Sequence, residues 1–137
     1  MKFDELLKLE RAKRVRKPKN GHPEEDLQAA CVEWFRYAWR KYWRLLFAVP
    51  NGGSRNAKEA ANLKRAGVVA GVADLLLLVP NKYYGALCLE AKWENNDQSE
   101  AQKEWERAAV AAGNKYALFR SLDEFMGIVN DYLKNVD

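Results

Sequence analysis

Gly-Val-Ala-Asp-Leu-Leu-Leu-Leu-Val, at residues 71–79, and Gly-Ala-Leu-Cys-Leu-Glu-Ala-Lys, at residues 85–92, are the stretches that decide the fold of this chain. Apolar runs of this length that are bounded by turn residues are typical of buried strands. The link between them, residues 80–84, begins with Pro and Asn, which favour turns. The sequence therefore predicts a β-hairpin that is buried on at least one face.

Three ionisable residues interrupt these apolar runs: Asp74, Glu90 and Lys92. If the hairpin turns about Lys82, Asp74 pairs with Glu90, and their Cβ atoms lie about 5 Å apart. Glu90 and Lys92 are two positions apart on a strand, so both point to the same face. Two carboxylates this close repel each other unless a positive charge neutralises them, and a divalent cation with oxygen ligands would do so. The pattern predicts a charged site at one end of the hairpin.

The order of an Asp, a hairpin and Glu-x-Lys resembles the signature of the PD-(D/E)xK nucleases. A wider pattern is similar to their virus-type replication–repair nuclease (VRR-NUC) branch. It comprises Val-Pro-Asn-Gly-Gly-Ser-Arg at residues 49–55, Leu-Lys-Arg-Ala-Gly at residues 63–67 and Gly-Val-Ala-Asp at residues 71–74. The resemblance covers residues 22–133. Ala73 stands where the superfamily name has Pro, a position that supplies no ligand.

The resemblance implies an α/β fold of the three-layer, restriction-endonuclease-like type, with a small mixed β-sheet and a central hairpin flanked by helices. It also implies a metal-dependent endonuclease that hydrolyses DNA. We expect a homodimer that resolves four-way (Holliday) junctions. A flap- or end-directed nuclease and a non-catalytic basic DNA-binding module are the alternatives, and the intact Asp74–Glu90–Lys92 set argues against the second. The lone His22 excludes a histidine-and-metal nuclease, which needs both a base and ligands.

The resembled family assigns roles to the residues around the hairpin. Mg²⁺, with Mn²⁺ as a substitute, would be held by the carboxylates of Asp74 and Glu90 and by the carbonyl of Ala91. Lys92 would orient the attacking water or act as a base. Gln102 has two interpretations that are compatible with each other. It is either part of a helix cap that begins at Ser99, or the polar residue that this family places beside the water.

An accessory acid is expected on the first helix, which the spacing of apolar residues predicts over residues 23–43. Glu25 and Gln28 are three apart and share a helix face. The resemblance implies an acidic residue followed by Gln here, as an accessory metal or water ligand. Glu25 fits this spacing best and Glu24 competes with it. The alternative is that these acids only complement the helix dipole.

The length and the positive net charge of the chain are typical of one small domain that binds a polyanion. The chain has 137 residues and a net charge of +4. Cys31 and Cys88 both lie in apolar patterns, so we expect reduced core thiols. No apolar run reaches the length of a membrane span and no signal peptide is visible. We expect no membrane and no small-molecule cofactor, and a cytoplasmic location in a bacterial or phage-infected cell.

Basic residues predict the DNA-contacting segments. Residues 1–20 form a basic arm and residues 21–137 the nuclease domain; the alternative for the arm is a solvated terminus. Residues 51–55 predict a loop close to a phosphate, or an ordinary turn. The candidate contacts are Arg14, Arg16, Lys17, Asn51, Ser54, Arg55, Lys58 and Lys64.

The other elements alternate along the chain. Strands are predicted over residues 45–49 and 115–120, and helices over residues 57–66, from 99 to about 112, and from 121 onward. The first helix carries more aromatic residues than one core stripe needs, which favours a partner chain over part of it.

Overall fold

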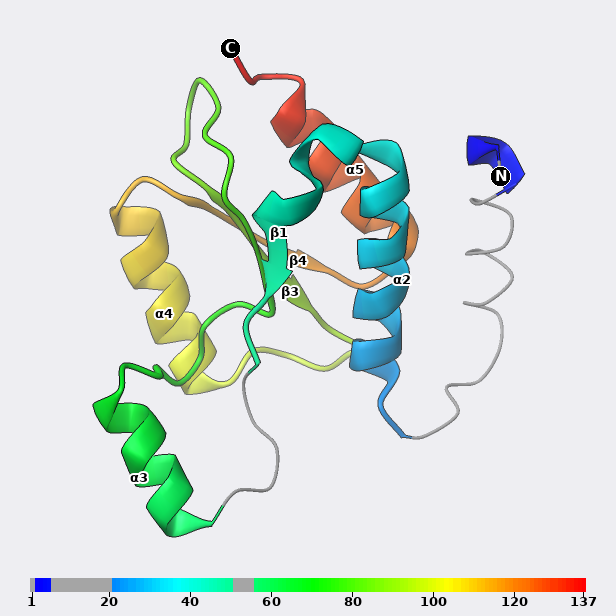
Figure 1. Ribbon diagram of the computed structural model, residues 1–137. Coiled ribbons are helices and arrows are strands. Elements are labelled where there is room, and N and C mark those ends of the chain that lie inside the picture. Colours follow the sequence, from blue (N-terminus) through cyan, green and yellow to red (C-terminus); the bar gives the residue numbers. More distant parts are fainter. Residues whose placement is uncertain (1, 6–20, 51–55) are drawn as a thin grey trace.

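The computed structural model describes residues 2–5, 21–50 and 56–137. Its elements follow the predicted order, apart from one added 3-10 helix, η1 (Figure 1). They are α2 (Pro23–Ala38), η1 (Arg40–Leu45), β1 (Leu46–Ala48), α3 (Ala57–Arg65), β2 (Leu75–Leu77), β3 (Leu87–Ala91), α4 (Glu100–Ala111), β4 (Lys115–Phe119) and α5 (Leu122–Leu133).

The first helix ends earlier than predicted. α2 stops at Ala38, because Trp39 leaves the helical conformation with φ −124° and ψ 56°. The Trp39 indole instead donates a hydrogen bond to Asn130 Oδ1 of α5, at 2.9 Å. The prediction of one helix over residues 23–43 was therefore wrong, since a contact with a distant residue turns the chain at Trp39.

The sheet has four strands in the order β1-β2-β3-β4. β1, β2 and β3 are antiparallel neighbours, whereas β3 and β4 are parallel, so the sheet is mixed as predicted. In the hairpin Leu75 pairs with Leu89 and Leu77 pairs with Leu87, which confirms the predicted register. The strands are shorter than the apolar runs. Asn81 Oδ1 closes the long connection by accepting from the backbone N–H groups of Tyr83 and Tyr84.

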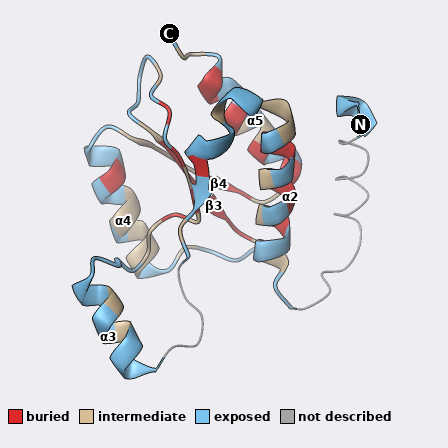
Figure 2. Cartoon of the chain, viewed as in Figure 1, coloured by how far each residue is buried: buried red, intermediate tan, exposed pale blue. Residues whose placement is uncertain are grey.

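Helices cover both faces of this sheet. α2 and α5 lie on one side of the strands and α4 lies on the other (Figure 1). Figure 2 shows the buried residues in the strands and on the inner sides of α2 and α5. The larger core cluster lies between the sheet and these two helices. It is built around Leu27, Cys31, Trp34, Phe35, Leu75, Leu77, Leu87, Leu89, Phe119, Phe125 and Val129.

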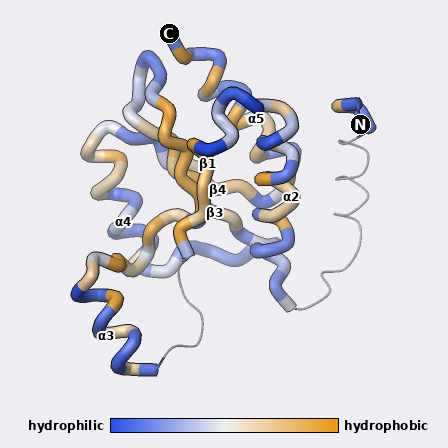
Figure 3. The backbone as a smooth tube through the Cα atoms, in the orientation of Figure 1, coloured by the Kyte–Doolittle hydropathy of each residue, from blue (hydrophilic) through white to orange (hydrophobic). Residues whose placement is uncertain are grey.

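The strand β3 is buried on both of its faces. All five of its residues are buried, which explains why its sequence does not alternate between apolar and polar residues and is apolar except at Glu90. Figure 3 shows the same hydrophobic centre in the strands. Cys31 and Cys88 are free, buried thiols, as predicted.

One helix, α3, lies at the margin of this core. α3 contains no buried residue and projects away from the sheet (Figure 1). Along the described residues no helix is both long and apolar enough to cross a lipid bilayer.

Candidate active site

The charged site lies where β2 begins and β3 ends. Asp74 immediately precedes β2, and continuing the hairpin register places it opposite Glu90. The backbone N–H of Ala91 donates to Asp74 Oδ2 at 2.9 Å, which ties the Asp74 carboxylate to the neighbouring strand. Asp74, Glu90 and Lys92 thus come together as the alternation of strand residues predicted.

Glu90 and Lys92 are charged residues inside the protein. Only 1% of the surface of Glu90 and 7% of that of Lys92 is exposed to solvent. Lys92 Nζ lies 3.8 Å from Glu90 Oε2. The other oxygen of Glu90, Oε1, is buried and receives no hydrogen bond from a donor among the described residues. The two carboxyl groups of Glu90 and Asp74 lie close enough to share a hydrogen bond when one of them is protonated. A buried carboxylate oxygen without a donor is costly, so this atom marks a place where a further positive group would be stabilising.

Gln102 links the two buried charges. Its Nε2 donates to Glu90 Oε2 at 2.8 Å, and its Oε1 accepts from Lys92 Nζ at 2.9 Å. The same Oε1 accepts from the backbone N–H of Ser99, and Ser99 Oγ accepts from the backbone N–H of Gln102. This is a capping box at the start of α4. The cap interpretation of Gln102 is confirmed, and the cap also brings its amide against Glu90 and Lys92. Its place beside an attacking water stays a prediction.

Burial sets the electrostatics of the carboxylate pair. It raises the pKa of Glu90 to about 8, and the nearby charge of Asp74 adds to this, while Lys92 opposes it. Burial also raises the pKa of Asp74 above its ordinary value, against the hydrogen bond from Ala91. One ammonium group does not compensate two carboxylates, so the site holds protons more tightly than free acids do.

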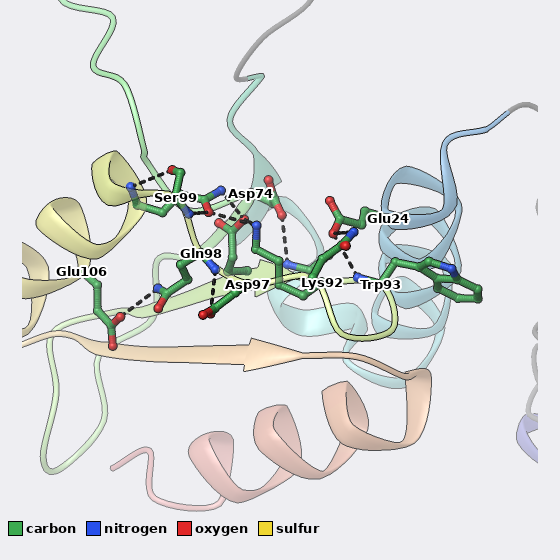
Figure 4. Close-up of polar contacts among 12 residues, drawn as sticks. Glu24, Asp74, Lys92, Trp93, Asp97, Gln98, Ser99 and Glu106 are labelled. Carbon is green, nitrogen blue, oxygen red and sulfur yellow. Dashed lines mark hydrogen bonds and ion pairs between the residues drawn. The ribbon is translucent and has the colours of Figure 1, made fainter.

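Glu24, rather than Glu25, is the acid of α2 that reaches the site. Glu24 Oε2 accepts from the backbone N–H of Trp93 at 2.9 Å, directly after Lys92. Its charge contributes to the raised pKa of Asp74. The side chain of Glu25 is 79% exposed and lies 4.0 Å from His22 Nδ1. Figure 4 shows Glu24 and Asp74 near each other at the end of β3.

The placement of Glu25 at the site was therefore a wrong prediction, and the reason is the rotation of the helix. Glu24 lies three and seven positions before Leu27 and Cys31, which are buried against the sheet. A helix places such positions on one face. The apolar stripe of α2 was thus a signal in the sequence that pointed to Glu24. The prediction instead chose Glu25, because Glu25 has the Glu-x-x-Gln spacing to Gln28 that the family resemblance implies.

The loop after Lys92 is held by residues that the sequence analysis missed. Arg120 Nη1 donates to the backbone carbonyls of Glu94 and Asn96, at 2.7 and 2.8 Å. Gln98 Nε2 donates to Glu106 Oε1 at 2.8 Å, a contact that Figure 4 shows beside α4. No local sequence pattern predicts that Arg120 binds a loop more than twenty positions before it in the chain.

The carboxylate pair fits a divalent cation. No cluster of three or more acids, histidines or cysteines able to hold a metal ion occurs among the residues described. The pair itself has three properties that suit one: two opposed carboxylates, raised pKa values and a Glu90 Oε1 that receives no hydrogen bond from the described residues. A cation held there would also use ligands from water or substrate, as Mg²⁺ does.

The predicted DNA contacts are only partly within the described chain. Lys58 and Lys64 are exposed on α3, the helix on the path from β1 to Asp74. The other predicted contacts lie outside the described residues: Arg14, Arg16, Lys17, Asn51, Ser54 and Arg55.

Comparison with known proteins adds a full-length likeness. The chain is similar to a solved structure described as a VRR_NUC domain protein, with a TM-score of 0.74 and 25% sequence identity. The match covers 89% of this chain and 94% of the other chain. No family model matches the sequence, and no curated protein matches it. The likeness therefore rests on the arrangement of the whole fold, a mixed four-stranded sheet with flanking helices of the restriction-endonuclease-like type.

Proposed function

The chain is a VRR-NUC domain, a nuclease-type fold, and from this premise we propose that it is a Mg²⁺-dependent endonuclease that hydrolyses phosphodiester bonds in DNA. One observation carries the proposal. Asp74 and Glu90 face each other at the end of the hairpin, and Glu90 keeps a buried oxygen without a donor among the described residues. Such a pair suits a cation that binds an anionic phosphate.

The cation would be held by the carboxylates of Asp74 and Glu90, together with the Ala91 carbonyl. When bound, it supplies charge neutralisation of the phosphate, an activated water and stabilisation of the leaving oxygen. Glu24 takes the accessory acid role in this proposal, in place of Glu25. Its carboxylate holds the backbone of Trp93, and thereby fixes the chain beside Lys92.

Lys92 and Gln102 would position the reactants. The ammonium group has three hydrogen-bond donors, and one of them is given to Gln102 Oε1. The remaining donors can orient the attacking water or a phosphate oxygen. Gln102 cannot rotate freely, because its amide is held by Ser99 on one side and Glu90 on the other. The helix cap therefore preorganises the ammonium group of Lys92.

The finer part of the proposal is a homodimer that cleaves four-way junctions. A two-fold dimer presents two sites to the symmetric branches of one junction. The aromatic residues of the first helix support this less than the sequence suggested. Trp34 and Phe35 are buried in the core, and Trp39 is bonded to Asn130, which leaves Trp43 as the large aromatic of this region that is well exposed. The small size of the domain is then the main support for a dimer.

A panel of labelled substrates tests both levels of the proposal. Four-way junction, flap, duplex and single-stranded DNA are incubated with Mg²⁺, with Mn²⁺ and with a chelator, and light scattering gives the oligomeric state with and without junction DNA. We expect cleavage only with metal, and fastest for the junction. Faster cleavage of flaps by a monomer would favour the flap-nuclease alternative. No cleavage of any DNA would favour the non-catalytic binding module.

A further inference from the structure

A basic and aromatic surface surrounds η1, away from the carboxylate pair. We call it the η1 surface, and it consists of Arg36, Arg40, Lys41, Trp43 and Arg44. All five side chains are exposed. Residues 34–58 contain no Asp or Glu, and the nearest acid along the chain is Glu33, one helical turn before Arg36. In Figure 3 the turn around η1 is hydrophilic and adjoins the hydrophobic strands.

The indole ring of Trp43 gathers two of these cations. The guanidinium carbons of Arg36 and Arg44 lie 4.9 and 5.1 Å from the centroid of the ring. Cation–π contact holds both groups near one another although like charges repel. Within the described part of the chain, none of the four cations of the surface forms an ion pair with a carboxylate. The surface is therefore a concentration of four cations with a single acid, Glu33, on the adjoining turn of α2.

Strand β1 sets the distance from this surface to the carboxylate pair. At one end of the strand the Val49 N–H donates to the Asp74 carbonyl, and at the other end the Leu78 N–H donates to the Leu45 carbonyl. η1 thus lies at the opposite end of the edge strand from Asp74. The four residue steps from Leu45 to Val49 correspond to about 13 Å of extended chain. In duplex DNA the phosphates of one strand rise by about 3.4 Å each along the helix axis, so this span corresponds to about four nucleotides of a duplex whose axis runs along β1.

We propose that the η1 surface binds the phosphate backbone of the DNA at least about four nucleotides away from the bond at the carboxylate pair. The inference deepens the proposed function and depends on it. Guanidinium groups suit phosphate oxygens because their donors form a planar fork, and the Trp43 ring orders two of them before DNA arrives. DNA bound here would extend from the cleaved bond along β1 towards η1.

The test compares two double variants that each remove two exposed cations. Arg40→Gln/Arg44→Gln alters the η1 surface, and Lys82→Gln/Arg107→Gln alters exposed cations elsewhere on the protein. Fluorescence anisotropy measures the affinity for a labelled duplex in chelator, between about 50 and 200 mM salt. We expect the η1 variant to flatten the log–log salt dependence by about 0.9 for each phosphate that the protein no longer binds, and the control variant to match the wild type. Circular dichroism checks that both variants are folded.

The outcomes separate this inference from the proposed function. An unchanged salt slope in the η1 variant would overturn the inference and point to an acidic protein, or solvent, as the neighbour of this surface. Because binding is measured in chelator, that result says nothing against cleavage by the wild type. Conversely, a wild type that cleaves no DNA contradicts the nuclease proposal even when the slope changes. With active protein, we expect the η1 variant to raise KM and to leave kcat unchanged, since none of its residues touches the carboxylate pair.

Discussion

At the Glu90 carboxylate one oxygen is bonded by Gln102 and the other has no donor among the described residues, in a side chain that solvent hardly reaches. A carboxylate is seldom buried in this way without a compensating charge, because desolvation disfavours the ionised form. Lys92 compensates it in part. Asp74, on the opposite strand, adds a second carboxylate, so the site has more negative than positive charge.

Removal of either carboxylate should abolish cleavage. For Asp74→Ala and for Glu90→Ala we expect no detectable cleavage with Mg²⁺ and a sharp loss of metal affinity by calorimetry. DNA affinity in chelator should survive or improve, because a negative group near the phosphate is removed. Wild-type cleavage rates in either variant would remove this site from consideration.

The neighbouring acids of α2 offer a matched pair of variants. Glu24→Gln should weaken metal binding and slow cleavage, since its charge acts on Asp74 and its oxygen holds the backbone of Trp93. Glu25→Gln should behave like the wild type, because that side chain faces solvent. The two substitutions remove the same charge from adjacent positions, so a comparable loss in both would argue for a general electrostatic effect of α2.

The stability of the metal-free protein should fall as the pH rises. The pKa of Glu90 is about 8 in the folded chain, above its value of 4.5 when exposed. Between these values the folded state binds more protons than the unfolded state, so the free energy of unfolding decreases with pH. A fall on the order of a few kcal/mol is expected from about pH 5 to about pH 9. Urea unfolding in chelator measures it. Glu90→Gln should flatten the profile, and Mg²⁺ should oppose the fall by binding the ionised pair.

At the scale of elements, the loop before β2 packs directly on the start of α4. Gly71 has φ +86°, and a Cβ atom built on it would lie 2.3 Å from the Ala101 carbonyl oxygen. Ala101 precedes Gln102, so this close approach brings the segment that carries Asp74 against the helix cap that carries Gln102. Only Gly satisfies both the positive φ and the close approach.

Gly71→Ala should therefore disturb the site as well as the fold. We expect a loss of more than about 2 kcal/mol in the free energy of unfolding, together with weaker metal binding, because the backbone of α4 must move away. Gly113→Ala is the matched control: φ is +96° there, but nothing lies within 4 Å of a new Cβ atom. It should cost about 1–2 kcal/mol and leave metal affinity unchanged. Equal effects of the two substitutions on metal binding would contradict the role of this close approach.

At the scale of the whole molecule, charge is unevenly distributed along the chain. Residues 1–20 carry eight Lys and Arg against three Asp and Glu. At its described start, the Phe3 ring stacks on Tyr37 of α2 with centroids 5.9 Å apart. The described start of the arm therefore contacts α2, the helix that leads to the η1 surface.

Neutralising the arm should weaken DNA binding in proportion to the number of phosphates that it binds. Replacement of the Lys and Arg of residues 8–19 by Gln keeps Phe3 in place and removes only charge. The log–log salt slope for duplex DNA should fall by about 0.9 for each phosphate that the arm no longer binds. An arm that is only solvated predicts the wild-type slope. Combining these changes with the η1 variant tests whether the two basic segments act on the same DNA, since independent phosphate contacts reduce the slope additively.

The hairpin register and the facing carboxylates were predictable from local sequence. Strand residues alternate with a period of two, and the apolar runs on either side of residues 80–84 are centred on Lys82, so Asp74 opposite Glu90 followed from their equal distance to Lys82. The capping box that places Gln102 is equally local, since its partners are three residues apart. The mixed sheet and its order of elements followed from the same periodicities and from the family resemblance.

Other features of the site came from interactions between distant parts of the chain. The rotation of α2 that selects Glu24 depends on how Leu27 and Cys31 pack on the sheet. The end of α2 depends on Asn130, and the loop after Lys92 depends on Arg120. Each of these results from many small packing and hydrogen-bond terms that no short window of sequence contains. Helix positions one residue apart differ by about 100° in direction. The apolar stripe of α2 therefore favours Glu24 over Glu25, but only the packed structure shows that this face of the helix meets the end of β3.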